Sequence, residues 1–146
     1  MDIELDIRPY RSEDESCLLA IWRAASAKGH PFFTSGELDA QAQLVREVYL
    51  PKAETWVAVL EDEPVGFIGL LDNFIGGLFV DPAIHGRGIG RTLIGHARKL
   101  KGTLELEVYA LNENARAFYE RLGFGEIDRQ ATDANGLPFE VIRLRG

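Results

Sequence analysis

The chain has 146 residues, of which 46% are hydrophobic and 27% are charged, and its formal net charge is −7. This length and composition predict one globular domain that spans residues 1–146. The negative charge argues against nucleic acid or an anionic membrane as the main partner, because both are bound by basic surfaces.

The first residues and the cysteine content indicate the compartment. The N-terminus is acidic where a signal peptide would be basic, and no apolar run approaches the roughly 18 residues of a membrane span. Cys17 is the single cysteine and cannot form an internal disulfide, which suits a reducing compartment. We therefore expect a cytoplasmic protein.

The first third of the chain predicts a strand and a helix. Alternation over residues 3–8 is typical of a half-buried strand. Ser12 and Glu15 have the spacing of a capping box at the start of the helix. Its buried face is expected to carry Leu18, Ile21, Trp22 and Ala25.

A second helix is predicted after an apolar loop. Thr34 and Glu37 have capping-box spacing. The buried face of this helix is expected to carry Leu38, Ala42, Val45 and Tyr49. Two interpretations of the loop stay open: Phe33 caps the core and His30 lies at the surface, or both residues line the pocket of an acceptor substrate.

The middle of the chain predicts an antiparallel meander. Three apolar runs over residues 55–60, 65–71 and 74–80 are joined by tight turns. Gly76-Gly77 interrupts the third run, and glycine inside a strand indicates a bulge or a close backbone approach.

A glycine-rich turn links this meander to the next helix. The segment Gly86-Arg87-Gly88-Ile89-Gly90-Arg91 precedes a helix predicted to end near Lys101. The buried face of that helix is expected to carry Ile89, Leu93, Ala97 and Leu100. Unpaired N–H groups, the helix dipole and two arginines together favour a phosphate or pyrophosphate site. The Rossmann fingerprint would need glycine or alanine at Arg91, and the P-loop lysine is absent.

The last third predicts a strand, a helix and a hairpin. The strand over residues 103–109 follows a right-handed crossover, so it is expected to lie parallel to the strand over 74–80. Asn112 or Asn114 caps the helix, and the strands over residues 124–131 and 139–144 form the hairpin. The result is an α/β chain with a mixed sheet.

Two segments resemble motifs of the GNAT N-acetyltransferase superfamily. Val80-Asp81-Pro82 followed by His85-x-x-Gly88-x-Gly90 resembles motif A, in which glutamine or arginine is usual at the position of His85. Asn112-x-x-Ala115-x-x-Phe118-Tyr119-x-x-x-Gly123-Phe124 resembles a second segment. The order of elements also matches, so the resemblance covers essentially the whole chain. Parts of both ends resemble the YjaB-like subgroup of bacterial acetyltransferases.

The resemblance implies the GNAT fold, a mostly antiparallel sheet that splays between its fourth and fifth strands and carries flanking helices. It further implies an acetyl-CoA-dependent N-acetyltransferase that moves an acetyl group to a primary amine by direct attack in a ternary complex. The residues that it assigns to the acetyl-CoA site are Leu78, Phe79, Val80, His85, Gly86, Arg87, Gly88, Ile89, Gly90, Arg91, Asn112 and Tyr119.

The catalytic roles are also implied by the resemblance. The backbone N–H of Leu78 would donate to the acetyl carbonyl as an oxyanion hole. Tyr119 would act as the general acid, because a phenol with a pKa near ~10 is protonated at neutral pH. From spacing alone, Tyr119 is equally consistent with a core aromatic residue.

A general base is harder to identify. The strand before the glycine turn carries no carboxylate or histidine. Glu107 is the first choice, as base and acceptor contact, although it could be a solvated strand carboxylate. His30 is the second, because the usual pKa of histidine suits neutral pH. Some members of the family need no dedicated base.

Two other functions stay open. One is a non-catalytic module that binds coenzyme A, and the other is an enzyme for a different phosphate ligand. The acceptor could be a small-molecule amine or an amine of a protein or peptide, and the chain could be a monomer or a homodimer. The three histidines lack metal-ligand spacing, so we expect no metal.

Overall fold

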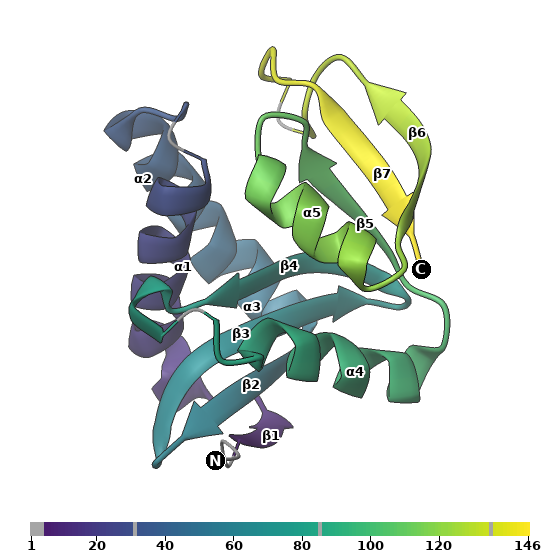
Figure 1. Cartoon of the computed structure of the whole chain (residues 1–146). Coiled ribbons are helices and arrows are strands. Elements are labelled where there is room, and N and C mark those ends of the chain that lie inside the picture. The colour runs from purple at the N-terminus through teal and green to yellow at the C-terminus, as the bar shows by residue number, and fades with distance from the viewer. Residues whose placement is uncertain (1–4, 31, 85, 135) are drawn as a thin grey trace.

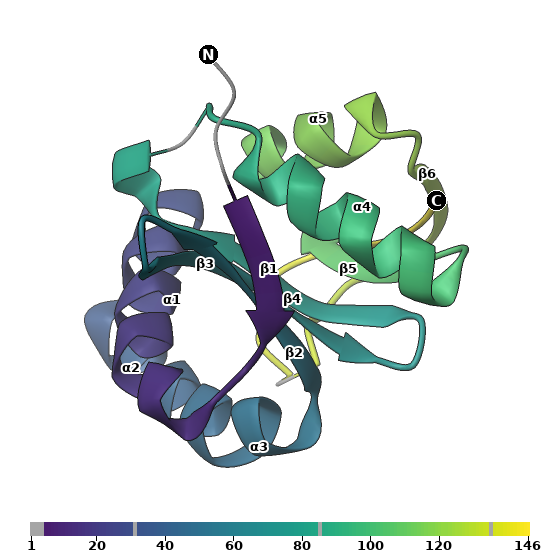
Figure 2. The same cartoon turned by 90° about the horizontal axis from the view of Figure 1, so that it is seen from below.

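The computed structural model describes residues 5–30, 32–84, 86–134 and 136–146 and shows a seven-stranded sheet between two groups of helices (Figures 1 and 2). The strands are β1 (Leu5–Pro9), β2 (Glu54–Leu60), β3 (Glu63–Leu71), β4 (Phe74–Val80), β5 (Glu105–Tyr109), β6 (Gly125–Gln130) and β7 (Val141–Arg145). Their order across the sheet is β1-β2-β3-β4-β5-β7-β6. This confirms the predicted mixed α/β fold and the final hairpin.

The helices form two layers. They are α1 (Glu15–Gly29), α2 (Ser35–Leu44), α3 (Leu50–Lys52), α4 (Ile89–Lys101) and α5 (Glu113–Arg121). Figure 2 shows α1, α2 and α3 on one side of the sheet and α4 and α5 on the other. Neighbouring residues of a strand point to opposite faces. Val57 of β2 therefore packs in the core beside α1 and α2, whereas Ala58 packs in the core beside α4. Within the described residues, no helix is both long and apolar enough to cross a membrane.

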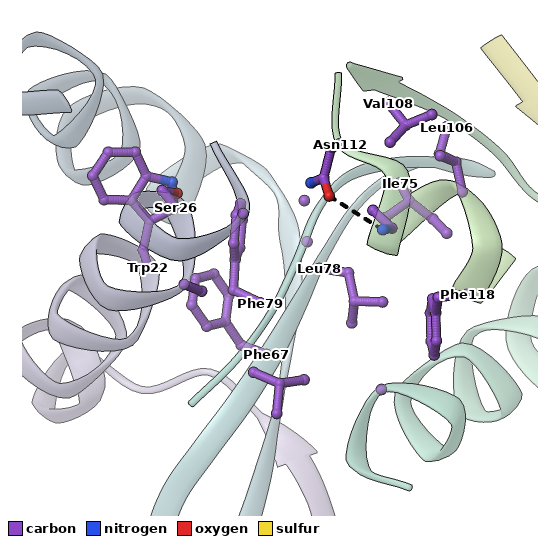
Figure 3. A pocket seen from close by; sticks show the side chains of 18 of the residues that line it. Trp22, Ser26, Phe67, Ile75, Leu78, Phe79, Leu106, Val108, Asn112 and Phe118 are labelled. Atoms are coloured by element: carbon purple, nitrogen blue, oxygen red, sulfur yellow. Dashed lines mark hydrogen bonds between the residues drawn. The ribbon is translucent and has the colours of Figure 1, made fainter. Parts of the chain in front are cut away.

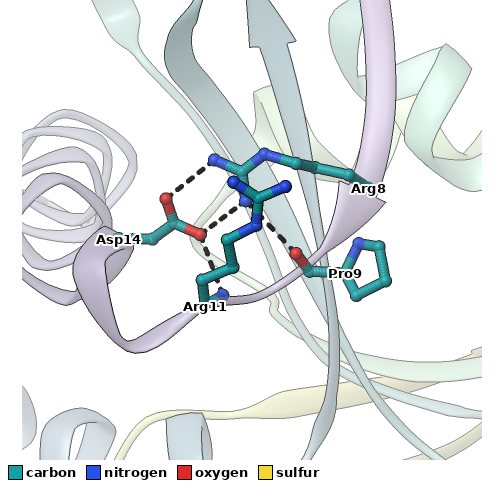
Figure 4. Close-up of polar contacts among 4 residues, drawn as sticks. All are labelled: Arg8, Pro9, Arg11 and Asp14. Carbon is teal, nitrogen blue, oxygen red and sulfur yellow. Dashed lines mark hydrogen bonds and ion pairs between the residues drawn. The ribbon is translucent and has the colours of Figure 1, made fainter.

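The start of α1 differs from its prediction. A 3-10 turn, Ser12–Asp14, precedes the helix, so the capping box between Ser12 and Glu15 is wrong. Asp14 is only 6% exposed, and its carboxylate accepts hydrogen bonds from two nitrogens of Arg8, at 2.7 and 2.8 Å, and from the backbone N–H of Arg11 at 2.9 Å (Figure 4). The buried carboxylate thus ties β1 to α1, and the arginine holds the pKa of Asp14 below its usual value. The capping box of Thr34 and Glu37 is confirmed.

Two predicted core positions are wrong. Tyr49 is 42% exposed, and Leu50 is buried in its place, because residues Val45–Tyr49 form a π-helical turn that changes the helical register. Leu100 is 47% exposed in the last turn of α4, whereas Ile94 is 1% exposed. Periodicity predicts the direction of a side chain around the helix axis, but it does not predict how far along the axis the neighbouring surface extends.

The sheet opens between β4 and β5, as predicted. These strands are parallel and pair only where Phe74 and Ile75 meet Glu105 and Leu106. The register of β4 against β3 shifts so that Gly69 pairs with Gly77 and Leu70 with Ile75. Gly76 is therefore the extra residue of a β-bulge. Beyond this point the two strands separate, and the space between them is the entrance to a cavity.

Candidate active site

A cavity of about 1070 Å³ occupies the opening between β4 and β5. Its walls come from both helical layers. In Figure 3, Trp22 and Ser26 of α1 lie on one side, Leu78 and Phe79 of β4 lie in the middle, and Phe118 of α5 lies on the other side. The volume is at the upper end of the roughly 300–1,000 Å³ of small-molecule sites. It is large enough for an extended ligand and a second reactant.

The glycine-rich turn has the backbone of an anion site. Gly86 and Gly88 have φ angles of 83° and 78°, which L-residues with side chains rarely adopt. No atom lies within 4 Å of the Cβ position of either glycine, so this side of the turn is open. Arg87 and Arg91 are exposed and line the cavity beside the first turn of α4. His85 lies outside the described residues.

Two of the implied cofactor residues, Ile89 and Gly90, lie in the first turn of α4. A Cβ on Gly90 would lie 3.0 Å from Cζ of Phe118, so a larger residue would push the two helices apart. Ile89 is 2% exposed and belongs to the core that includes Tyr119. Both residues line the cavity, and the absence of a side chain on Gly90 lets Phe118 of α5 lie close to the turn.

The backbone of β4 presents alternate residues to the opening. The N–H of Asp81 donates to the carbonyl of Val65 in β3 at 2.9 Å. The carbonyl of Phe79 lies 3.0 Å from the Cβ position of Gly66, also in β3. Because successive residues of a strand direct their backbone groups to opposite neighbours, Leu78 and Val80 face the side from which β5 has separated. This is the orientation that a hydrogen-bond donor to a ligand in the opening needs.

Tyr119 lies in the last turn of α5. It is 8% exposed, lines the cavity and packs between the rings of Phe118 and Phe124, with centroid distances of 5.1 and 5.5 Å. Burial raises the pKa of Tyr119 above its usual value. The hydroxyl therefore keeps its proton at neutral pH, as a general acid must.

Asn112 caps α5, as predicted. Its Oδ1 accepts a hydrogen bond from the N–H of Ala115 at 3.2 Å. Its Nδ2 lies 3.3 Å from the Cβ position of Gly29, at the end of α1. Asn112 and Gly29 therefore meet where the first helix approaches the second half of the chain, and both line the cavity.

The two candidate bases differ in their surroundings. Glu107 lines the cavity, and its carboxylate is 3.2 Å from a guanidinium nitrogen of Arg143 on β7. His30 also lines the cavity, but burial lowers its pKa to about 4. The expectation that the pKa of His30 suits neutral pH is therefore wrong, because removal from water disfavours the charged form of the ring.

Phe33 does not line the cavity, which corrects its assignment as an acceptor contact. It is 7% exposed and belongs to the core beside α1 and α2. Its ring packs against His30 and Tyr109, with centroid distances of 5.9 and 5.3 Å. It therefore supports two residues that do line the cavity.

Several lining residues were missed from the sequence. Tyr109 donates a hydrogen bond to Asp133 at 2.8 Å, and Asp133 is 8% exposed. Gln41 of α2 has a buried amide nitrogen without a hydrogen-bond partner in the described structure. In the sequence, Asp133 has the context of a turn residue and Gln41 that of a polar helix face. Only the fold brings them to the cavity. The described residues contain no group of side chains that could hold a metal ion.

Comparisons with known proteins agree with this geometry. Residues 51–126 match the acetyltransferase (GNAT) domain. The chain is 37% identical over 141 residues to peptidyl-lysine N-acetyltransferase YjaB of Salmonella typhimurium, covering 96% of this chain and 97% of that protein.

Solved structures show the same fold. The solution structure of apo YjaB from Escherichia coli superposes with a TM-score of 0.90 at 36% identity, over 98% of this chain and 97% of that one. The crystal structure of PaiA N-acetyltransferase from Thermoplasma acidophilum in complex with coenzyme A has a TM-score of 0.79 at 18% identity, over 97% of this chain and 98% of that one.

The match to the GNAT domain and the likeness to N-acetyltransferases over almost the whole chain identify the protein as an acyltransferase. The chain belongs to the GNAT acetyltransferases and is similar to the YjaB proteins over almost its whole length.

Proposed function

We propose that this enzyme transfers the acetyl group of acetyl-CoA to the side-chain amine of a lysine in a protein, by direct attack in a ternary complex. The observation that carries the proposal is the open, left-handed turn of Gly86 and Gly88, flanked by two arginines at the mouth of the splayed strands. The names of the similar YjaB proteins support lysine as the acceptor.

The residues around the turn would hold the pyrophosphate of acetyl-CoA. Backbone N–H groups at the start of α4 would donate to its oxygens, and the guanidinium groups of Arg87 and Arg91 would balance its charge. Gly88 lets the ligand approach the backbone because it has no side chain. When bound, acetyl-CoA supplies an activated thioester.

Three groups would act on the reacting atoms. The N–H of Leu78 would donate to the thioester carbonyl and stabilise the charge that develops there. The hydroxyl of Tyr119 would donate its proton to the departing sulfur. Glu107 would accept the proton of the amine through water, with Arg143 keeping its carboxylate in place. With a pKa of about 4, His30 is too weak a base for this role at neutral pH.

The charges along the cavity support an amine acceptor. Arg87 and Arg91 lie at the proposed coenzyme end, and the carboxylates of Glu107 and Asp133 lie on β5 and in the last hairpin. The other charged lining residues are Lys28 of α1 and Arg121 of α5. An anionic coenzyme and a cationic acceptor would thus be drawn to different parts of the same cavity. A cytoplasmic location and a monomeric or homodimeric state stay predictions.

Thermal unfolding with acetyl-CoA, coenzyme A, NAD or ATP tests the coenzyme. A ligand at 100 times its Kd stabilises a protein by about 2.7 kcal/mol, which is a rise in Tm of about 5–10 °C for a domain of this size. We expect this rise with acetyl-CoA and with coenzyme A, and no rise with NAD or ATP. Mass spectrometry of a lysine peptide incubated with enzyme and acetyl-CoA then tests the acceptor. A rise with NAD or ATP and none with acetyl-CoA would refute the proposal.

A further inference from the structure

The end of α2 contains a change of helical register. Residues Val45–Tyr49 form a π-helical turn, which accommodates one more residue than a regular α-helical turn. As a result, Leu50 fills the core and is 4% exposed, whereas Tyr49 is 42% exposed. In a regular helix, Tyr49 would share the buried face of Leu38 and Val45. The π turn therefore moves a large aromatic ring out of the core.

The ring of Tyr49 lies against the bulge of β4. A Cβ on Gly76 would be 3.9 Å from Cδ1 of Tyr49 and 3.8 Å from Cδ1 of Leu71. Gly76 is two residues before Leu78, whose N–H is the proposed donor to the acetyl carbonyl. Tyr49 and Leu71 both line the cavity. Tyr49 is therefore beside the route by which an acceptor would reach the reacting carbonyl.

A second tyrosine lines the cavity from β5. The hydroxyl of Tyr109 donates to Asp133, which also accepts from the N–H of Leu137 at 2.9 Å. Burial raises the pKa of Tyr109, and so do the hydrogen bond to Asp133 and the negative charge of that carboxylate. Tyr49 and Tyr109 line the same cavity, as do the carboxylates of Asp133 and Glu107.

This combination suits an alkylammonium chain. Aromatic rings bind apolar methylene groups along their faces and attract a cation by their quadrupole. Asp133, which accepts from the hydroxyl of Tyr109, adds negative charge to this cavity, and Glu107, paired with Arg143, lines it as well. An unbranched chain ending in an amine matches both features, whereas a short amine would leave the rings uncovered.

We propose that Tyr49 determines the acceptor selectivity of this enzyme: its ring, with that of Tyr109, encloses the alkyl chain of a lysine-type amine and directs the nitrogen to the Gly76 bulge. The proposal rests on the proposed function and goes beyond it by assigning the residue that selects the acceptor.

The experiment uses the full chain and saturating acetyl-CoA. Two peptides with blocked N-termini carry either one lysine or its shorter homologue, a diaminopropionyl residue. We expect Tyr49→Ala to lower kcat/KM for the lysine peptide about tenfold, mainly through KM, which is the size of a lost cation–π contact. The preference for lysine over the shorter amine should shrink as well. Tyr49→Phe should stay within about twofold of wild type, because it keeps the ring.

Val48→Ala is the matched control. Val48 is the preceding residue, is 38% exposed and does not line the cavity. Val48→Ala should leave kcat/KM unchanged for both peptides. The Tm shift with acetyl-CoA should be the same in all variants, which shows that coenzyme binding and folding are intact.

The outcomes separate the two proposals. If wild type acetylates the lysine peptide and Tyr49→Ala does so with the same kcat/KM and the same preference, the role of Tyr49 is refuted while the proposed function stands. If wild type binds acetyl-CoA and acetylates neither peptide, lysine is not the acceptor and both proposals are refuted. If Tyr49→Phe is as impaired as Tyr49→Ala, the hydroxyl rather than the ring selects the acceptor, and enclosure by the ring is refuted.

Discussion

The coenzyme end and the acceptor end of the cavity are built in different ways. At the coenzyme end, most proposed contacts lie in one stretch from Leu78 to Arg91, and the rest are Tyr119 of α5 and its N-cap Asn112. At the acceptor end, lining residues come one at a time from separate elements: His30 after α1, Gln41 in α2, Tyr49 in the π turn, Tyr109 in β5 and Asp133 before β7. A local motif thus specifies the first region, and long-range packing assembles the second.

The two ends also differ in the kind of group that would contact the ligand. A pyrophosphate can be held by backbone N–H groups, which need only a given chain conformation and glycines that permit it. An acceptor is selected by side chains that must converge from several elements. The coenzyme end should therefore be sensitive to changes in the backbone, and the acceptor end to changes in single side chains.

The largest effect is expected at Gly88. We predict that Gly88→Glu abolishes the Tm shift with acetyl-CoA, because the new carboxylate would enter the open side of the turn and repel the pyrophosphate. The φ angle of 78° also disfavours any residue with a Cβ. Gly95→Glu is the control, since Gly95 lies in α4, the helix that follows Gly88, has open space around its Cβ position and does not line the cavity. If Gly88→Glu is folded and binds with unchanged affinity, the pyrophosphate lies elsewhere.

A smaller effect is expected at Tyr119, where the two ends meet. Tyr119→Phe keeps the ring contacts with Phe118 and Phe124 but removes the proton donor. We predict a fall in kcat of about 100-fold, the lower range of general-acid catalysis, with an unchanged Kd for acetyl-CoA. Tyr10→Phe, outside the cavity, is the matched control. An unchanged kcat would mean that the hydroxyl takes no part in the reaction.

The smallest effect concerns pH and the acceptor end. The unfolded chain protonates His30 near its ordinary pKa of 6.5, whereas burial lowers the pKa in the folded protein to about 4. Below pH 6.5 the unfolded chain therefore binds a proton at His30 that the folded protein does not. The contribution of His30 to the free energy of unfolding is fully present above pH 6.5 and is lost as the pH falls towards 4. Because the ring of His30 is partly exposed, we expect the free energy of unfolding to fall by only about 2 kcal/mol over this pH range.

Denaturant unfolding at several pH values measures this loss. His30→Gln cannot titrate, so its free energy of unfolding should fall less than that of wild type over this range. The other titrating groups contribute equally to the pH dependence of both proteins, so the comparison removes their contributions. One of them is Asp14, whose lowered pKa also makes the protein less stable in acid. Equal slopes in both proteins would show that His30 is not desolvated.

Much of the fold could be predicted because its signals are local. The runs over residues 55–60, 65–71 and 74–80 lie within β2, β3 and β4, and Gly76-Gly77 gave the correct position of the bulge. The errors have a common cause. Ser12, Tyr49 and Leu100 were assigned from spacing alone, whereas the buried Asp14, the π turn and the last turn of α4 decide their places.

The sequence by itself determined the order of the elements and the glycine turn before α4, and the phosphate ligand that we propose for this turn follows from that pattern. Backbone conformation is governed by neighbouring residues, and glycine, proline and periodicity report it directly. The tertiary structure alone decided that Tyr109 meets Asp133, that Phe33 lies behind His30 and that Tyr49 faces the bulge. These contacts join residues far apart in the chain, and they depend on how whole elements pack, which no local pattern specifies.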